Sequence, residues 1–495
     1  MDKRNNKKRA PVVVVLGHVD HGKSSLLEAI RDFEITSKES GGITQHVGAY
    51  EVDHKDQKIT FIDTPGHEAF SAIRARGAQV ADIAVLVVDS ADSVQPQTKE
   101  AITVINKAEI PMIVALNKID KPTADPEKIK RELSAQNVFV ESMGGKVPSV
   151  NISAKTKEGM NELLDLILLV ADLEALEADV ESPAEGVVIE SNTDSFRGPA
   201  ATLLVQKGTL KIKDVIGTDT ACAKIKGLED FQGRAIKKAI PSQPTIVLGF
   251  DKAPWVGEKF QTFDSLDQAA GNMKEVKRAD LSFSLKEGQK VLNIILKADV
   301  VGSLEALVEI LKELPQEKVA LRILKSEIGD IVESDTKVAE TSKAQIVGFR
   351  VKVNPGVLQA MRKDKEKRVK IKTFDVIYNL VQEVRQMMEK NIAPEVVRQD
   401  IGKMKTLVVF WAEGRRQIVG GKVFEGEFKK GLKLEVQRNS EKVGEGKIIN
   451  LQRNKKDVDR AIKGDECGIL FEGSVKIEEG DIIVAFSEER VRDTL

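Results

Sequence analysis

Short apolar runs alternate with stretches of helical periodicity over about the first 176 of the 495 residues. Each run has the length of a buried strand and ends directly in polar residues; the runs are 12–16, 58–62, 83–88, 112–116 and 148–152. Such alternation predicts a parallel sheet covered by helices on both faces. Because ligands of such sheets lie beyond the carboxyl ends of the strands, we expect the five strand ends to gather around one pocket.

The pattern changes several times after this first α/β region, which we assign to residues 1–178. Residues 184–275 are rich in strand-like runs broken by glycine and proline, which predicts a small β-barrel. Residues 286–373 return to α/β alternation, and Ser303 is placed to cap a helix there. Its sequence contains no catalytic triad, metal-binding cluster or phosphate loop. We therefore interpret this block as a rigid relay between domains.

An apolar stripe at helical spacing follows over 374–393, and the remaining residues, 397–495, are strand-rich again. The stripe predicts a helix that is either part of a core or a connector to the last domain. Short segments at 430–434 and 479–482 echo segments in the first barrel, which suggests two barrels of one kind. The predicted fold class is therefore multidomain α/β plus β.

Gly17-His-Val-Asp-His-Gly-Lys-Ser24 lies between the first apolar run and a helical pattern, as a phosphate-binding P-loop requires. Gly17 and Gly22 allow the backbone to curl so that successive N–H groups face an anion. A glycine turn that matches by coincidence is the alternative. The candidate phosphate-binding residues are Gly17, His18, Val19, Asp20, His21, Gly22, Lys23, Ser24 and Ser25. The spacing of His18 and His21 also occurs in metal sites, but we favour anion binding because both belong to this loop.

Asp63-Thr-Pro-Gly66 follows the second apolar run and indicates a site for Mg²⁺ and a terminal phosphate. Asp63 would hold the metal through water, and the Gly66 N–H would contact a γ-phosphate. His67 comes next and is placed to orient an attacking water. Thr44, in the glycine-rich segment 40–50, supplies a second hydroxyl ligand beside Ser24. The metal ligands are therefore Ser24, Thr44 and Asp63, and the segments 40–50 and 63–76 are expected to be switches that the γ-phosphate orders.

Asn117-Lys-Ile-Asp120 follows the fourth apolar run. We expect this segment to select the base of a bound nucleotide. An ionised Asp120 only accepts hydrogen bonds, so it pairs with the N1–H and amine of guanine and repels the acceptor edge of adenine. Lys118 would lie along the base. Three further candidate nucleotide-binding residues follow the last apolar run: Ser153, Ala154 and Lys155. We therefore expect the chain to bind GTP or GDP with Mg²⁺.

Composition excludes several other classes of protein. The net charge is −1, so there is no global basic field for nucleic acid, although local basic patches are present. No apolar run approaches the ~18 residues of a membrane span, and the basic N-terminus lacks a hydrophobic signal region. The two cysteines, Cys222 and Cys467, have no CxxC spacing, which argues against disulfides or zinc. We expect a cytoplasmic protein without a membrane partner.

The motifs Gly17 to Ser24, Gly41-Gly-Ile-Thr-Gln-His46 and Asp63-Thr-Pro-Gly-His-Glu-Ala-Phe70 together resemble those of the translational GTPases, specifically the bacterial translation initiation factor two family. The resemblance implies a P-loop GTPase domain, a barrel as second domain, a small α/β/α third domain, a connecting helix and a C-terminal barrel. It implies His67 as the catalytic histidine and GTP hydrolysis stimulated by the ribosome. The chain begins only about ten residues before its first strand, whereas most bacterial members carry a long N-terminal extension.

The resemblance also implies partners. The last barrel of the family binds the formylmethionyl end of initiator tRNA, and Glu466-Cys467-Gly468 is similar to part of that pocket. The small and large ribosomal subunits and other initiation factors are the further expected partners of a protein that is a monomer off the ribosome. Two positions depart from the family pattern: Lys213 and Gly421 stand where a glycine and a cysteine are expected.

Two rival functions use the same nucleotide pocket. An elongation-type carrier of aminoacyl-tRNA would need only three domains, so the second α/β block and the extra barrel count against it. A GTPase that activates a metabolic enzyme would be indifferent to ribosomes. The hypothesis we adopt is GTP-dependent delivery of formylmethionyl initiator tRNA to the small subunit, promotion of subunit joining, and release after hydrolysis.

Overall fold

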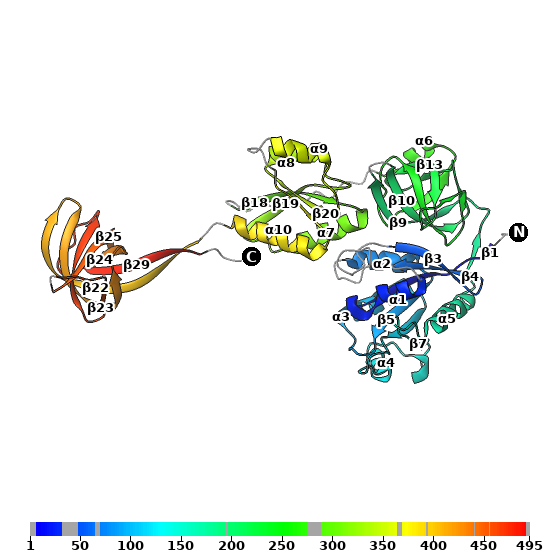
Figure 1. Cartoon of the computed structure of the whole chain (residues 1–495), viewed down its shortest axis with the longest axis horizontal. Helices are drawn as coiled ribbons and strands as arrows, with labels where there is room; N and C mark the ends of the chain where they lie inside the picture. The colour runs from blue at the N-terminus through cyan, green and yellow to red at the C-terminus, as the bar shows by residue number, and fades with distance from the viewer. Residues whose placement is uncertain are drawn as a thin grey trace. The chain divides into compact units, whose positions relative to one another are not determined.

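The computed structural model describes residues 6–31, 48–64, 70–194, 197–274, 289–363, 369–392, 395–439, 441–454 and 456–491. Its contacts divide the chain into two compact units, Met1–Met388 and Glu389–Leu495. Each unit is described by itself below, and Figure 1 labels their elements.

A six-stranded sheet forms the first part of unit one, with the strand order β3-β4-β2-β5-β6-β7. All strands after the antiparallel edge strand β3 are parallel. The strands are β2 (Val12–Gly17), β3 (Gly48–His54), β4 (Gln57–Asp63), β5 (Ile83–Asp89), β6 (Met112–Asn117) and β7 (Ser149–Asn151). The five strands expected from the apolar runs are confirmed.

Helices cover both faces of this sheet. Successive valines of β2 point to opposite faces, so both faces are apolar and are buried by helices. Val13 and Val15 share a core with Leu26 and Leu27 of one helix, whereas Val14 lies beside Gly77 of another. The helices are α1 (Lys23–Arg31), α2 (Ser71–Val80), α3 (Pro96–Ala108), α4 (Pro126–Ser134) and α5 (Met160–Leu173). Short 3-10 turns occur at Val19–His21 and Glu141–Met143.

The last three residues of the segment 40–50 are not loop residues. Gly48, Ala49 and Tyr50 open β3 and pair with β4, and the Tyr50 side chain is buried and stacked on Phe61. These three positions, which the sequence assigned to a switch segment, therefore belong to a strand, and burial of the tyrosine ring favours that local structure. Residues 40–47 lie outside the described residues.

A closed β-barrel follows, as the sequence predicted. Its sheet runs β12-β17-β9-β10-β16-β13, and a further pairing of β12 with β13 closes it. Lys213 has a φ of 78°, in the left-handed region that favours glycine, which explains why a glycine is expected at this position. The elements are β9 (Glu185–Asp194), β10 (Gly198–Lys207), β11 (Leu210–Lys211), β12 (Val215–Gly217), β13 (Cys222–Glu229), β14 (Ala235–Ile236), β15 (Lys238–Ala239), β16 (Pro244–Phe250), β17 (Lys259–Phe263) and α6 (Leu266–Gly271).

The second α/β block is a four-stranded parallel sheet in the order β19-β18-β20-β21. Ser303 does not cap its first helix: the N-cap is Val300, and Ser303 is buried in the first turn, so that prediction was wrong. The elements are β18 (Lys290–Ala298), α7 (Val301–Glu313), β19 (Val319–Ile328), α8 (Glu333–Ser342), β20 (Gln345–Phe349), α9 (Pro355–Lys363), β21 (Ile371–Phe374) and α10 (Ile377–Asn391). Helix α10 confirms the helix expected from the apolar stripe.

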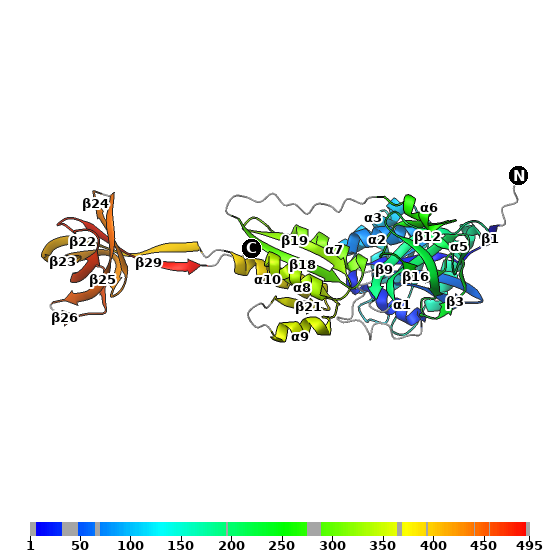
Figure 2. The same cartoon turned by 90° about the horizontal axis from the view of Figure 1, so that it is seen from above.

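Unit two is a second closed barrel, with the order β22-β29-β24-β25-β28-β23 and a closing pair of β22 with β23. The pairing of β22 with β29 continues beyond the barrel as a two-stranded ribbon, which Figure 2 shows in side view. The strands are β22 (Glu395–Glu413), β23 (Arg416–Lys429), β24 (Lys433–Arg438), β25 (Glu441–Arg453), β26 (Lys456–Asp457), β27 (Arg460–Ile462), β28 (Glu466–Gly473) and β29 (Ile482–Val491). Among the described residues of both units, no helix has the length and apolar character to cross a bilayer.

The first barrel is attached to the first sheet through a partly buried polar junction. Arg9 makes two 2.7 Å hydrogen bonds to Asp82, and its guanidinium also donates to the Ser242 hydroxyl of the barrel at 3.1 Å. Thr60 donates to the Ser242 carbonyl at 2.6 Å. Beside this junction β1 (Asn6–Lys8) pairs with β8 (Glu177–Asp179). The junction fixes the barrel close to the strands that form the site described next.

We expect Arg9→Met to lower the free energy of unfolding of unit one by about 2 kcal/mol, because it leaves Asp82 without its charged partner. The matched control is Lys8→Met, whose ion pair with Asp172 is exposed and contributes little. Urea unfolding followed by circular dichroism measures both variants. Equal stability of the two variants would contradict a structural role for the junction.

Candidate functional site

The polar strand ends lie at one edge of the first sheet. The register pairs Val15 with Asp63, Gly17 with Val87, and Asp89 with Asn117. Because these strands are parallel, their carboxyl ends are neighbours, and the loops that follow them converge. The structure thus brings together the phosphate loop, Asp63 and the segments at 117–120 and 153–155.

Two glycines of the phosphate loop are required by close approaches. A β-carbon on Gly17 would lie 2.3 Å from the Val87 carbonyl oxygen, and one on Gly22 would lie 2.4 Å from Nδ2 of Asn117. Both residues also have positive φ values, 146° and 90°. Only glycine meets these conditions, so the tight turn before α1 is encoded at these two positions.

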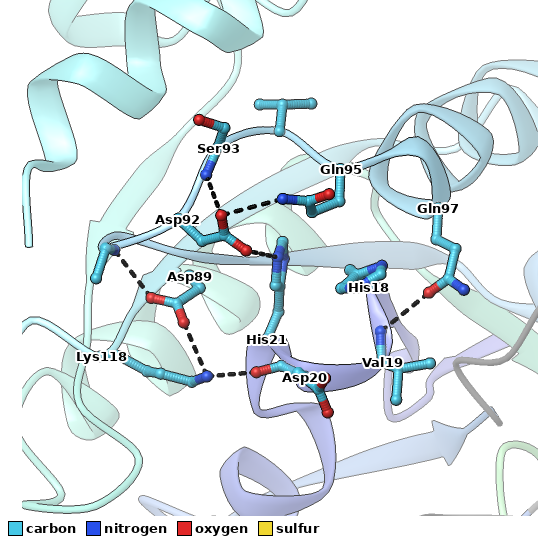
Figure 3. Close-up of polar contacts among 12 residues, drawn as sticks. His18, Val19, Asp20, His21, Asp89, Asp92, Ser93, Gln95, Gln97 and Lys118 are labelled. Carbon is cyan, nitrogen blue, oxygen red and sulfur yellow. Dashed lines mark hydrogen bonds and ion pairs between the residues drawn. The ribbon is translucent and has the colours of Figure 1, made fainter.

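Side chains hold the carbonyl groups of the phosphate loop. Lys23 Nζ donates to the Gly17 and His18 carbonyls at 2.8 and 2.6 Å. Asn117 Nδ2 donates to the His21 carbonyl at 2.9 Å. Lys118 donates to the Asp20 carbonyl (Figure 3). The N-terminus of a helix such as α1 favours an anion, because the first amide groups of a helix have no acceptor within the helix.

The Lys23 ammonium is almost fully buried. Burial lowers the pKa of Lys23 to about 7, against the opposing attraction of Asp63. An anion bound in the loop would raise that pKa again, since it stabilises the charged form. The electrostatics of the loop therefore suit a phosphate site, in which the negative charge of the ligand stabilises the charged form of Lys23.

Asp120 is kept ionised at the other end of the site. The Ser153 hydroxyl donates to Asp120 at 2.7 Å and holds the pKa of that carboxyl below its usual range. The backbone N–H of Ala154 donates to Asn117 Oδ1 at 3.0 Å, and Lys155 is exposed nearby in sequence. An ionised, accessible carboxylate that only accepts hydrogen bonds suits a ligand edge that carries N–H donors.

Asp89, at the end of β5, is a site residue to which sequence reasoning gave no role. Its carboxylate binds Lys118 at 2.8 Å and Lys121 at 3.1 Å. Burial raises the pKa of Asp89, but the hydrogen bonds from Lys118, the Ala91 N–H and Lys121 together outweigh burial, so the net pKa is lowered. Asp89 thereby orients the lysine that sequence analysis placed along the base. Its position directly after an apolar run was the available signal.

His18 and His21 lie edge to face, with ring centroids 5.0 Å apart. His21 is buried, and its Nε2 is 4.0 Å from Asp92 Oδ2 (Figure 3). Burial lowers the pKa of His21 to about 4, so the ring is neutral at pH 7. No group of three potential metal-ligating side chains occurs within the described part of the chain.

The residues assigned to Mg²⁺ are only partly described. Ser24 lies in the first turn of α1 and Asp63 ends β4, both at the ligand edge of the sheet. A hydroxyl and a carboxylate are the hard oxygen donors that Mg²⁺ prefers, so these residues fit the ion. Thr44, Gly66 and His67 lie outside the described residues, and Ser25 is an exposed residue of α1.

The residues assigned to the tRNA end lie on β28 of the second barrel, where they face opposite sides. Cys467 points into the core, with its Sγ 3.7 Å from Met404 Sδ, and burial raises its pKa to about 11. Glu466 is exposed, and open space surrounds the position of a β-carbon on Gly468. Glu466 and Gly468 therefore share the outer face, and Cys467 does not.

Gly421 pairs with Cys467 across the strands. A β-carbon on Gly421 would lie 2.4 Å from the Lys405 carbonyl oxygen. The close approach of β22 thus leaves no room for a side chain at this position.

Similarity to known proteins decides the family. Translation initiation factor IF-2 of Pelotomaculum thermopropionicum is 43% identical over 98% of this chain and 51% of that protein. IF-2 of Caldanaerobacter subterraneus subsp. tengcongensis is 42% identical over 98% of this chain and 70% of that protein. This chain belongs to the translation initiation factor IF-2 family. It spans about half of the first relative's length and about two thirds of the second's.

Four family models match successive parts of this chain. Residues 8–172 match the elongation factor Tu GTP binding domain, and residues 267–385 match Translation-initiation factor 2. The two barrels match elongation factor G domain 2 over 183–263 and elongation factor Tu domain 2 over 416–484. The fold is thus that of a translational GTPase. GDP-bound aIF5B from Aeropyrum pernix aligns over 97% of this chain and 92% of that chain, with 27% identity and a TM-score of 0.46.

The buried neutral His21 generates a pH prediction. Between pH 6.5 and about 4 the unfolded chain binds a proton at this ring and the folded chain does not, so stability falls as the pH falls through this window. The gap corresponds to about 3 kcal/mol. We expect His21→Gln, which does not titrate, to lose less stability than the wild type between pH 7 and 4.5, measured by urea unfolding.

The control is His54→Gln, which removes a histidine on the β3–β4 hairpin, away from the phosphate loop. A pH dependence of His21→Gln equal to that of the wild type would show that His21 is not held neutral by the fold.

Proposed function

We propose that this chain is a translation initiation factor that binds and hydrolyses GTP. The observation that supports this most strongly is the convergence of the phosphate loop, Asp63 and an ionised Asp120 at one sheet edge, in a chain of the IF-2 family. Cytoplasmic localisation and a monomeric state off the ribosome are part of the proposal.

The nucleotide is proposed to lie along this edge. Backbone amides from Gly22 to Ser24 and the Lys23 ammonium bind the phosphates. Asp120 accepts from guanine N1–H and the exocyclic amine, and Lys118, oriented by Asp89, lies along the base. Ser24, Thr44 and Asp63 would hold Mg²⁺, and the ion would supply positive charge to neutralise the phosphates.

Hydrolysis is proposed to depend on His67, placed after Gly66 to orient the attacking water. The Gly66 N–H and Thr44 sense the γ-phosphate and lose their contacts on hydrolysis. The ribosome stimulates this step by completing the arrangement of His67.

The proposed partners are formylmethionyl initiator tRNA, both ribosomal subunits and other initiation factors. The outer face of the second barrel at Glu466 and Gly468 takes the aminoacyl end of the tRNA. Cys467 supports that face from the core. GTP then promotes subunit joining, and hydrolysis releases the factor.

Asp120→Asn tests the base-binding part of this proposal. The amide presents a donor where guanine also presents donors, so we expect GTP affinity to fall at least 10-fold and xanthosine triphosphate, which carries an acceptor there, to bind better than GTP. Equilibrium titration with both nucleotides measures the change. An unchanged preference for GTP would place the base elsewhere.

His67→Ala tests the hydrolytic part together with the ribosomal partner. We expect GTP binding within about twofold of the wild type and a loss of about 10²-fold or more in ribosome-stimulated hydrolysis. Phosphate release is measured with and without ribosomes and formylated initiator tRNA. Wild-type turnover that ignores both additions would exclude the initiation role, and unchanged turnover of the variant would remove His67 from catalysis.

A further inference from the structure

Among the described residues, helix α3 provides a hydrogen bond to the phosphate loop from outside the strand-end segments. The backbone N–H of Val19 donates to Oε1 of Gln97 at 3.1 Å (Figure 3). The carbonyls of the neighbouring residues are bound by Lys23, Lys118 and Asn117, as described above. The Val19 contact comes instead from a helix that contributes nothing else to the proposed mechanism.

Gln97 is fixed by its place at the start of α3. Pro96 occupies the first turn and sets its backbone, and Thr98 is buried beside it. Helix α3 packs against β2, which leads into the loop, and against β5, the neighbour of β2 in the sheet. Gln97 is therefore held by an element that is not part of the loop.

A second contact anchors the same face of α3. Glu100 lies three residues after Gln97 and accepts a hydrogen bond from Arg74 of α2 at 2.5 Å. The Arg74 side chain is almost completely buried. Helix α3 is therefore held between α2 and the phosphate loop, which gives the Gln97 amide a defined position.

We propose that Gln97 is a positioning residue of the nucleotide site: its amide oxygen holds the Val19 N–H and so keeps the phosphate loop in its anion-binding shape. The side chain acts through the loop backbone and does not contact the nucleotide. The inference rests on the guanine-nucleotide part of the proposed function and is independent of the tRNA and ribosome parts.

Loss of this acceptor has a defined consequence. The Val19 N–H must remain unpaired or turn to another partner, and either change disturbs the loop amides that bind phosphates. Since those amides contact groups that GDP and GTP share, both nucleotides should dissociate faster by a similar factor. A single net hydrogen bond corresponds to about a fivefold change in rate.

The test measures dissociation of fluorescent GDP and of a fluorescent non-hydrolysable GTP analogue from the full chain by stopped flow. Gln97→Met keeps the size of the side chain and removes the acceptor, so we expect dissociation of both ligands to accelerate about fivefold. Gln97→Glu keeps an oxygen acceptor and should restore rates to within about twofold of the wild type.

Thr103→Val is the matched control, because Thr103 is an exposed residue of the same helix whose hydroxyl donates to the Lys99 carbonyl at 3.0 Å, not to the loop. Its rates should equal those of the wild type. Thermal unfolding of all variants separates the positioning role from a merely structural one. A merely structural role would change the melting temperature and leave the dissociation rates unchanged. If Gln97→Met folds poorly, Gln97→Ala replaces it in the same comparison.

Wild-type rates for Gln97→Met, or equal acceleration in Gln97→Met and Gln97→Glu, would overturn the assignment. A wild-type chain that does not bind the fluorescent GDP would instead contradict the nucleotide site itself, so the two failures are distinguishable.

Discussion

The Val87 carbonyl oxygen lies where a side chain at residue 17 would begin, and the architecture of the nucleotide edge depends on that close approach. The chain can leave β2 and turn within a few residues into α1 only because residue 17 has no β-carbon. This turn places Lys23 beneath the loop and brings the His21 carbonyl within reach of Asn117. The phosphate end and the base end of the site are thus linked by a hydrogen bond from the Asn117 side chain to the backbone of the phosphate loop.

Much of the fold could be predicted from hydrophobic periodicity. Buried parallel strands read as continuous apolar runs, so all five central strands were found, and the polar residues that end them gave the site. Both barrels and helix α10 were also expected from spacing. Ser303 misled the prediction because its hydroxyl suggested a cap, whereas the helix begins earlier, at Val301. The glycine-rich pattern at 40–50 gave no sign of the strand that begins at Gly48, because burial of the Tyr50 ring favours that strand.

The parts of the site that sequence reasoning missed are those made by residues distant along the chain. Asp89 orients Lys118 across neighbouring strands, and Gln97 reaches Val19 from a helix whose amphipathic pattern gives no hint of a polar contact. No motif spacing encodes either contact, because both depend on how α3 and β5 are placed in three dimensions. Cys467 shows the converse case: adjacent residues of a strand face opposite sides, so a three-residue sequence match does not describe one surface.

Both barrels are closed by a single additional strand pairing, β12 with β13 and β22 with β23. An open sheet would present a row of unpaired amides and carbonyls that another chain can extend by adding a strand. Closure removes that opportunity from the core of each barrel. The two all-β parts of the chain are in this way protected against edge-to-edge aggregation.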